Sequence, residues 1–128
     1  MHETTPPLPG LSPVNGKAVT ARFDGGSLSS DAGLLALREV ERRLDVAGRL
    51  AACVDDPRDP NRTLHSVADI LRFRMMMIAA GYEGGIDANA RRSDPIFKMA
   101  LERTPEARDR CSRSTVRRLE FHTLLRTF

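Results

Sequence analysis

Residues 67–80 are strongly apolar, and any fold of this chain must bury them. Their apolar side chains recur at helical spacing and leave almost no polar face: Val67, Ile70, Leu71, Met75, Met77 and Ile78. Ser66 is suited to cap the first turn, and Gly81 follows the last one. The pattern therefore predicts a central, buried helix. Arg74 lies on the buried stripe, so we expect its charge to be paired with a carboxylate or to reach solvent.

Further helices are predicted around this central one. A helix is expected to open at residues 29–31 and to bury one apolar stripe, with Arg38 facing solvent; the stripe comprises Leu34, Leu37, Val40 and Leu44. Shorter helices are predicted over 47–54 and 86–92. Asp94 and Pro95 are typical of the cap and first residue of a helix, here over 95–102.

The N-terminal residues carry a different pattern. Residues 1–17 are rich in Pro, Gly and Thr without periodicity, which predicts a disordered leader. Residues 19–23 alternate between apolar and polar, which predicts a short strand. The fold class is therefore mainly α: a small helical bundle over 18–120 with one short N-terminal strand.

Positive charge is concentrated toward the C-terminus. Residues 103–126 contain seven arginines against three acidic residues, and eighteen of the twenty basic residues of the chain are Arg. GC-rich coding favours Arg, but guanidinium groups also suit phosphates and guanine edges. A basic patch of this kind is what contact with nucleic acid requires.

The sequence gives little support to a membrane, secreted or zinc-binding protein. No apolar run approaches the roughly 20 residues that a membrane span needs, and the N-terminus lacks the pattern of a secretory signal. These features predict a cytoplasmic protein with no membrane partner. Cys53 and Cys111 are far apart and belong to no zinc-binding pattern.

The last predicted helix holds the candidate DNA-binding residues, which are Arg113, Ser114, Thr115, Arg117 and Arg118. Ser112 or Ser114 caps this helix, and Val116 and Leu119 anchor it to the core. Hydroxyl groups, free N–H groups and the helix dipole at such an N-terminus favour a phosphate. With the helix over 95–102 it would make a helix-turn-helix-like C-terminal part. The alternative is a solvated amphipathic helix that touches no DNA.

Several segments, in this order, resemble the transposases of insertion-sequence family thirteen-eighty. They are Phe23–Leu35, Asp56–Pro60, His65–Arg72, Gly81–Glu83, Asp94-Pro95 and Ser114–Glu120. The resemblance covers about residues 19–120. It implies a DDE-type enzyme with a ribonuclease-H-like catalytic domain, which acts on the terminal inverted repeats of a mobile element.

The resemblance also implies where catalysis would occur. Such enzymes use Mg²⁺ held by Asp, Asp and Glu, and in the family these residues lie downstream of the part present here. We therefore expect an N-terminal fragment with no catalytic residue, no metal site and no cofactor of its own. Residues 121–128 are interpreted as a truncated or frameshifted tail. The chain's standing as an enzyme stays open.

Other candidate catalytic groups are weaker. Asp55, Asp56 and Asp59 stand beside prolines, where carboxylates serve mainly as caps and turn formers. His65 and His122 have no partner at the spacing of a catalytic pair.

The sequence thus predicts the DNA-binding and dimerising part of a transposase, cytoplasmic and associated with the nucleoid. Its partners would be double-stranded DNA at the inverted repeats, and a second copy of the chain or an intact transposase. Two alternatives stay open: a protein-interaction module that dimerises or docks on intact transposase, and a non-functional remnant.

Overall fold

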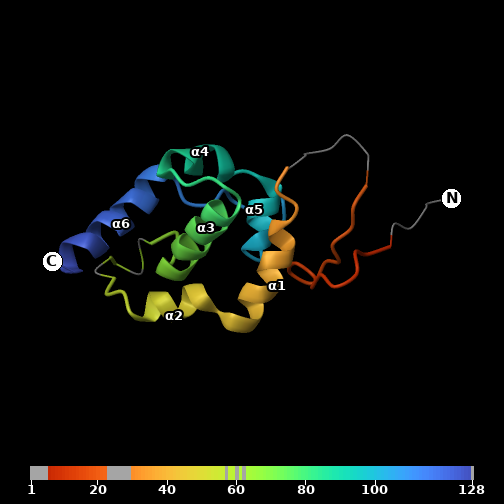
Figure 1. Cartoon of the computed structure of the whole chain (residues 1–128), viewed down its shortest axis with the longest axis horizontal. Coiled ribbons are helices and arrows are strands. Elements are labelled where there is room, and N and C mark those ends of the chain that lie inside the picture. The colour runs from red at the N-terminus through yellow and green to blue at the C-terminus, as the bar shows by residue number, and fades with distance from the viewer. Residues whose placement is uncertain (1–5, 23–29, 57, 60, 62, 128) are drawn as a thin grey trace.

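The computed structural model describes residues 6–22, 30–56, 58–59, 61 and 63–127, with the backbone alone for 121–127. The chain is mainly helical, as predicted. In chain order its elements are α1 (Leu34–Leu44), α2 (Val46–Ala52), α3 (Val67–Ala79), the 3-10 turn η2 (Gly85–Asp87), α4 (Ala88–Arg91), α5 (Pro95–Ala100) and α6 (Arg113–Thr127). Figure 1 shows α3 in the middle, with the other helices arranged around it.

The central helix α3 begins where the sequence predicts. The hydroxyl of Ser66 accepts a hydrogen bond from the N–H of Asp69 at 3.1 Å, and Gly81 beyond the helix adopts a φ of 95°, which favours glycine. The core around α3 comprises Leu34, Ile70, Phe73, Met76, Met77, Ala88, Phe97, Ala100, Leu101, Cys111 and Val116. The prediction of a buried central helix is confirmed, except that Ile78 is 52% exposed.

Arg74 has the partner that its position demands. Its Nε donates to Oε1 of Glu120 at 2.8 Å, and its Nη2 donates to the carbonyl oxygen of Glu83 at 2.6 Å. The pairing prediction is confirmed. Because Glu120 belongs to α6, this ion pair also connects α3 to α6.

The buried face of α1 differs from the predicted one. Leu34 and Leu35 are buried, but the next buried positions are Arg38 and Glu41, which are 1% and 8% exposed. The apolar side chains expected inside are instead 36%, 48% and 50% exposed: Leu37, Val40 and Leu44. A charged group stays inside only when its hydrogen-bonding capacity is satisfied, and both of these groups meet that condition.

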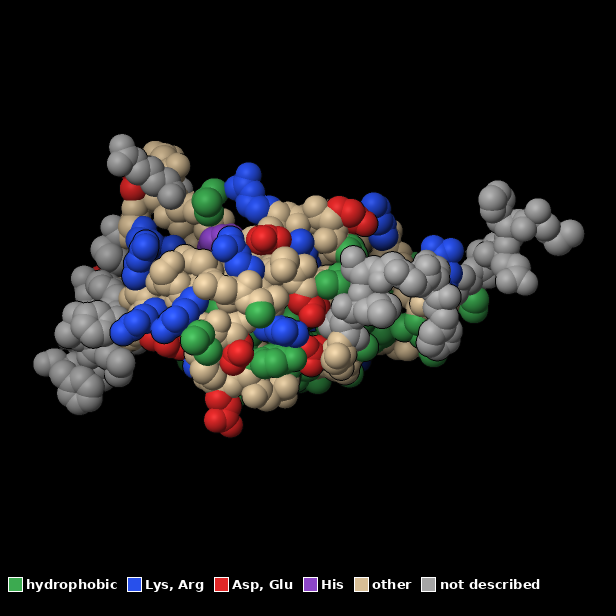
Figure 2. Space-filling view, turned by 90° about the horizontal axis from the view of Figure 1, so that it is seen from above, with side chains coloured by type: hydrophobic (Ala, Val, Ile, Leu, Met, Phe, Trp, Pro, Cys, Tyr) green, Lys and Arg blue, Asp and Glu red, His purple; other side chains and the backbone are tan. Residues whose placement is uncertain are grey.

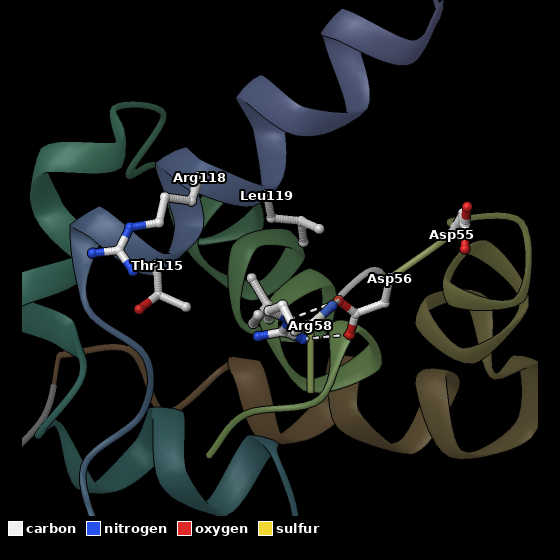
Figure 3. Close-up of a pocket in the computed structure, with 7 residues that line it drawn as sticks. Asp55, Asp56, Arg58, Thr115, Arg118 and Leu119 are labelled. Carbon is white, nitrogen blue, oxygen red and sulfur yellow. Dashed lines mark hydrogen bonds and ion pairs between the residues drawn. The ribbon is translucent and has the colours of Figure 1, made fainter. Parts of the chain in front are cut away.

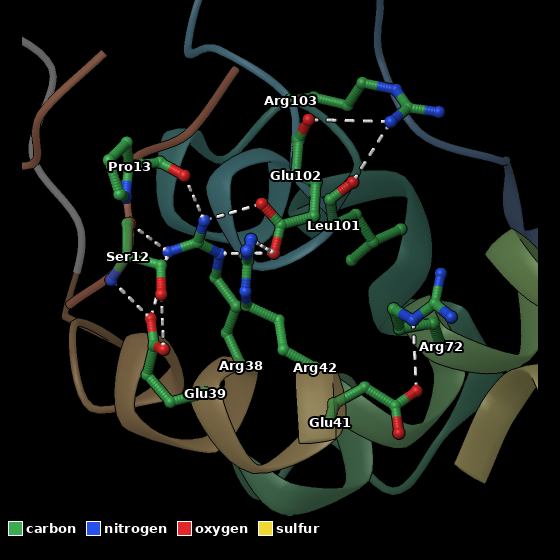
Figure 4. Close-up of polar contacts among 10 residues, drawn as sticks. All are labelled: Ser12, Pro13, Arg38, Glu39, Glu41, Arg42, Arg72, Leu101, Glu102 and Arg103. Carbon is green, nitrogen blue, oxygen red and sulfur yellow. Dashed lines mark hydrogen bonds and ion pairs between the residues drawn. The ribbon is translucent and has the colours of Figure 1, made fainter. Parts of the chain in front are cut away.

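Arg38 connects three segments of the chain (Figure 4). Its Nε and Nη2 donate to the two carboxylate oxygens of Glu102 at 2.7 and 2.5 Å. Its Nη1 and Nη2 donate to the carbonyl oxygens of Ser12 and Pro13, each at 2.7 Å. Glu39 in turn accepts from the N–H and hydroxyl of Ser12 at 2.7 and 2.8 Å. Residues 12 and 13, which the sequence places in the leader, therefore dock on α1; residues 1–5 lie outside the described part.

Glu41 joins α1, α2 and α3. Its carboxylate accepts from the N–H groups of Val46 and Ala47 at 2.7 and 3.1 Å, which satisfies the first turn of α2. It also accepts from Nε of Arg72 on α3 at 3.0 Å (Figure 4). This buried acid therefore fixes how the first three helices meet.

The predicted strand over 19–23 does not form in its described part, residues 19–22. Among the described residues an isolated bridge joins Val14 and Lys17, and the N–H of Leu8 donates to the carbonyl oxygen of Val19 at 2.8 Å. A strand needs a series of such bonds to a neighbouring segment, and this single bond does not make one. Of the three residues predicted to share one face of this strand, Val19 is buried and Ala21 is exposed, while Phe23 lies outside the described residues.

The shorter helices follow the sequence closely. α2 falls within one residue of the predicted start, and η2 with α4 covers the region predicted over 86–92. Asp94 caps α5 by accepting from the N–H of Ile96 at 2.8 Å, and Pro95 is its first residue. Phe97 and Leu101 bury their side chains in the core, and the ring of Phe97 meets that of Phe73 edge-on at 5.7 Å between centroids.

Candidate nucleic-acid interface

The first turn of α6 is held by hydrogen bonds to Ser112, which precedes the helix, and to Asn89 on α4. Ser112 is the cap: its hydroxyl accepts from the N–H of Thr115 at 3.4 Å, and its carbonyl oxygen accepts from the N–H of Val116 at 3.1 Å. Ser114, the other candidate cap, lies inside the helix. The N–H of Arg113 donates to the side-chain oxygen of Asn89 at 3.0 Å. Two of the first-turn N–H groups expected to face a phosphate are therefore already engaged.

One face of α6 anchors the helix. Val116 is 1% exposed and belongs to the core, and Leu119 packs against that core from its edge. Both anchors were predicted. The ion pair between Arg74 on α3 and Glu120 on α6 adds a polar contact to these two apolar ones. The first two turns of α6 therefore have a fixed orientation relative to α3.

The opposite face presents the predicted DNA-binding residues. Arg113, Ser114, Arg117 and Arg118 are exposed, and Thr115 is half-buried. The hydroxyls of Ser114 and Thr115 lie 2.9 and 3.2 Å from that of Ser112, so these two residues form a small hydroxyl cluster rather than free donors. The structure thus brings all five residues together on two turns of one helix.

The exposed arginines of α6 have no acidic partner. Within the described part of the chain, most other arginines lie within 4 Å of a carboxylate: Arg38, Arg42, Arg58, Arg72, Arg74, Arg91 and Arg103. Those described without such a partner are Arg43 and Arg49 at helix ends, and a C-terminal group formed by Arg92, Arg108, Arg110, Arg113, Arg117 and Arg118. In Figure 2, basic side chains gather at the left, the end at which Figure 1 places α6.

A cavity of about 310 Å³ lies beside this surface, and sequence patterns did not reveal it. It is lined by Asp55, Asp56, Arg58, Ile70, Thr115, Arg118 and Leu119. Figure 3 shows Thr115 and Arg118 on the α6 side, across from Arg58 and Asp56. The guanidinium of Arg58 binds the carboxylate of Asp56 through two contacts of 2.8 Å, so these two charges offset each other at the cavity wall.

The helix-turn-helix-like arrangement is not confirmed. α6 packs against α3, η2 and α4, whereas α5, its predicted partner, packs mainly against α1. Residues 101–112 separate α5 from α6, and Figure 1 shows α5 beside α1, with α3 between α5 and α6. A connection of this length lets the second helix dock elsewhere, whereas three or four residues would hold it beside the first.

A model of one protein family, described as Transposase DDE domain group 1, matches residues 11–127. The chain belongs to this transposase family. No curated protein and no solved structure matches this transposase chain. The match begins at Leu11, next to the residues that dock on Arg38, and it includes the whole of the candidate interface.

Transposases of this kind use Mg²⁺ held by carboxylates. Among the residues that the structure describes, no three His, Cys, Asp or Glu side chains gather closely enough to hold a metal ion, so these residues do not fit that group. Asp56 and Asp59 accept hydrogen bonds from the N–H groups of Arg58 and Asn61 at 3.1 and 3.0 Å. They act as turn formers, as the sequence predicts.

Two further predictions concern the ends of the site. His65 is half-buried. Its burial lowers its pKa, and the positive charge of Arg110 lowers the pKa further. The side chain of His122 lies outside the described residues. The backbone of α6 continues as helix to Thr127, through the segment interpreted as a tail.

No described helix is long and apolar enough to cross a bilayer.

Proposed function

We propose that this transposase chain binds duplex DNA at the terminal inverted repeats of an insertion sequence of family thirteen-eighty, among the DNA of the nucleoid. Its contact surface is the first two turns of α6. One observation carries the proposal: Arg113, Arg117 and Arg118 are exposed and without acidic partners, on a helix whose other face is anchored in the core.

The geometry of α6 suits a polyanion. Arg113 and Arg117 are four residues apart and therefore share one face of the helix. An anchored helix loses little conformational freedom on binding, and unpaired guanidinium groups have no internal ion pair to break. Contacts of this kind go mainly to phosphates, so they position the protein and make its affinity strongly dependent on salt.

The proposal is tested by fluorescence anisotropy with a labelled duplex that carries the element's terminal repeat. The variant Arg113→Gln with Arg117→Gln is expected to bind at least about tenfold more weakly, because hydrogen bonds to charged groups contribute about 1.5–3 kcal/mol each. The slope of log K against log salt should become less steep by about 0.9 for each phosphate that the variant no longer neutralises.

The matched control is Arg43→Gln with Arg49→Gln, which removes the same charge from exposed arginines on α1 and α2. This control should retain most of the affinity and the original slope. Equal weakening in the two double variants would mean that net charge, rather than α6, governs binding. That outcome would contradict the assignment of the site.

A second candidate function, self-association, is favoured by an apolar groove between α1 and α3. The groove, about 340 Å³, is lined mainly by exposed or half-exposed apolar side chains: Leu37, Val40, Leu44, Val46, Met75 and Ile78. Such patches mark interaction surfaces, and two-fold pairing would bring this face of two copies together. Light scattering should then find a dimer that Val40→Asp converts to a monomer. A monomeric mass for the unchanged chain at every concentration would exclude this function.

A further inference from the structure

A second group of arginines lies beside the start of α6, where the residue after α4 meets the segment before α6. The N–H of Arg110 donates to the carbonyl oxygen of Arg92 at 2.9 Å, and Nε of Arg92 donates to the carbonyl oxygen of Arg110 at 3.1 Å. Nη2 of Arg110 donates to the carbonyl oxygen of Arg108 at 2.6 Å. These bonds join Arg92 to Arg110 and place the backbone of Arg108 against the guanidinium of Arg110; we call Arg92, Arg108 and Arg110 the Arg110 cluster.

Arg110 is buried without a counterion. The residue is 6% exposed, yet its Nε is fully buried with no hydrogen-bond partner. Its one hydrogen bond through the guanidinium goes to a carbonyl oxygen, and no described carboxylate lies within 4 Å of it. A buried charge normally has an ionic partner, because desolvation without one is costly.

Asp69 and Asp109, the acidic groups whose charges act on Arg110, are paired with other cations. Asp69 lies 3.6 Å from Arg72 and 3.6 Å from Arg103, and Asp109 lies 3.2 Å from Lys98. Arg92 and Arg108 make no ion pair with any described carboxylate either. The Arg110 cluster therefore carries an excess of positive charge that the described chain does not offset.

The pKa shifts of Arg110 and His65 are consistent with this excess of positive charge. Burial lowers the pKa of Arg110, and the charge of Arg103 lowers it further, while Asp69 and Asp109 act in the opposite sense. Burial also lowers the pKa of His65. The charges of Arg110, Arg92 and Arg108 add to that effect, and Asp69 opposes it.

We propose that the Arg110 cluster is a binding site for a tetrahedral, phosphate-type anion. In the transposase the anion is a backbone phosphate of the DNA that α6 contacts, a ligand assignment that rests on the proposed function. Arg110 precedes Arg113 by three residues, and both segments are bonded to the α4 region, Arg110 to Arg92 and the N–H of Arg113 to Asn89, so the cluster adjoins the start of α6. A planar guanidinium fork matches the spacing of phosphate oxygens.

His65 provides a readout that does not depend on DNA. In the full chain, its ring protons are followed by NMR from pH 5 to 8, with the signal assigned by its disappearance in His65→Gln. The probe is sulfate at constant ionic strength, a tetrahedral dianion whose charge does not change over this range. Bound sulfate should raise the pKa of His65 toward its ordinary value, because the anion offsets the arginine charges.

Two variants separate charge from folding. Arg110→Gln should abolish the effect of sulfate on His65, and Arg108→Gln, at an exposed position, should weaken it without threatening the core. Arg43→Gln should leave it unchanged. An effect of sulfate that survives in Arg108→Gln and Arg110→Gln alike, or that is absent from the unchanged chain, would overturn the proposal.

Measurements of duplex DNA binding by the same variants separate the anion site from the proposed function. Arg108→Gln should reduce the salt slope of duplex binding by about 0.9, as expected when the chain neutralises one phosphate fewer. If sulfate acts on His65 but neither α6 nor cluster variants change DNA binding, the anion site stands with a free phosphate compound as its ligand. If the α6 variants no longer bind DNA while sulfate has no effect, the proposed function stands and the anion site is wrong.

Discussion

Replacing Arg38 with Met is the sharpest test of how this fold is held together. The change keeps an unbranched side chain but removes the charge that binds Glu102 at 2.7 and 2.5 Å and the carbonyl oxygens of Ser12 and Pro13. Breaking a buried ion pair by removing one partner costs about 3–5 kcal/mol. Since Glu102 is 32% exposed and partly screened by solvent, we expect the lower end, about 3 kcal/mol.

Urea unfolding followed by circular dichroism measures this free energy. For a chain of this length a decrease of about 3 kcal/mol corresponds to a fall in Tm of roughly 12 °C. A double-mutant cycle with Glu102→Gln isolates the pairwise interaction and should give a coupling between about 0.5 and 3 kcal/mol. The control Arg49→Met, at an exposed arginine without an ion pair, should stay within about 0.5 kcal/mol of the unchanged chain.

The reasoning would be refuted in either of two ways. Arg38→Met could unfold within about 1 kcal/mol of the unchanged chain, or its effect could add to that of Glu102→Gln without coupling. The first result would mean that the charge of Arg38 does not stabilise the fold through Glu102 and residues 12–13, and the second would mean that Arg38 and Glu102 do not stabilise it as a pair.

Three further predictions concern single groups. Burial raises the pKa of the Cys111 thiol to about 11, so Ellman's reagent at pH 8 should modify the exposed Cys53 quickly and Cys111 only in urea. Hydrogen bonds from Ser12 lower the pKa of Glu39. Its stabilising contribution is therefore present above pH 4.5, its ordinary value, and is lost as the pH falls further; Glu39→Gln should flatten that acid-induced decrease in unfolding free energy. Ser66→Ala removes the cap of α3 and should cost about 1 kcal/mol in urea unfolding.

The sequence predicted those features of the fold that depend only on residues close together in the chain. The caps of α3 and α5 and the central position of α3 follow from residues adjacent in the chain. The buried face of α1 could not be predicted in this way. Burial of Arg38 depends on Glu102, sixty-four residues away, and the apolar periodicity of α1 placed Arg38 on the solvent face.

The candidate site shows the same division. The exposure of Arg113, Ser114, Arg117 and Arg118 could be predicted from the sequence, because a capped helix with two apolar anchors leaves its other face outside, whereas Thr115 is half-buried. The Arg110 cluster could not, since Arg92 and Arg110 meet only through the docking of two segments. Whether an arginine has an acidic partner is a property of the fold, and most of the described arginines without one belong to this C-terminal group, with Arg43 and Arg49 outside it.

Arginine footprinting with phenylglyoxal, read by mass spectrometry on the unaltered chain, tests the central claim most directly. Duplex DNA at low salt should protect Arg113, Arg117 and Arg118 from modification, while Arg43 and Arg49 stay reactive. High salt should remove the protection, because phosphate contacts weaken as salt rises. Equal modification of the α6 arginines with and without DNA, under conditions where the duplex is bound, would contradict the account.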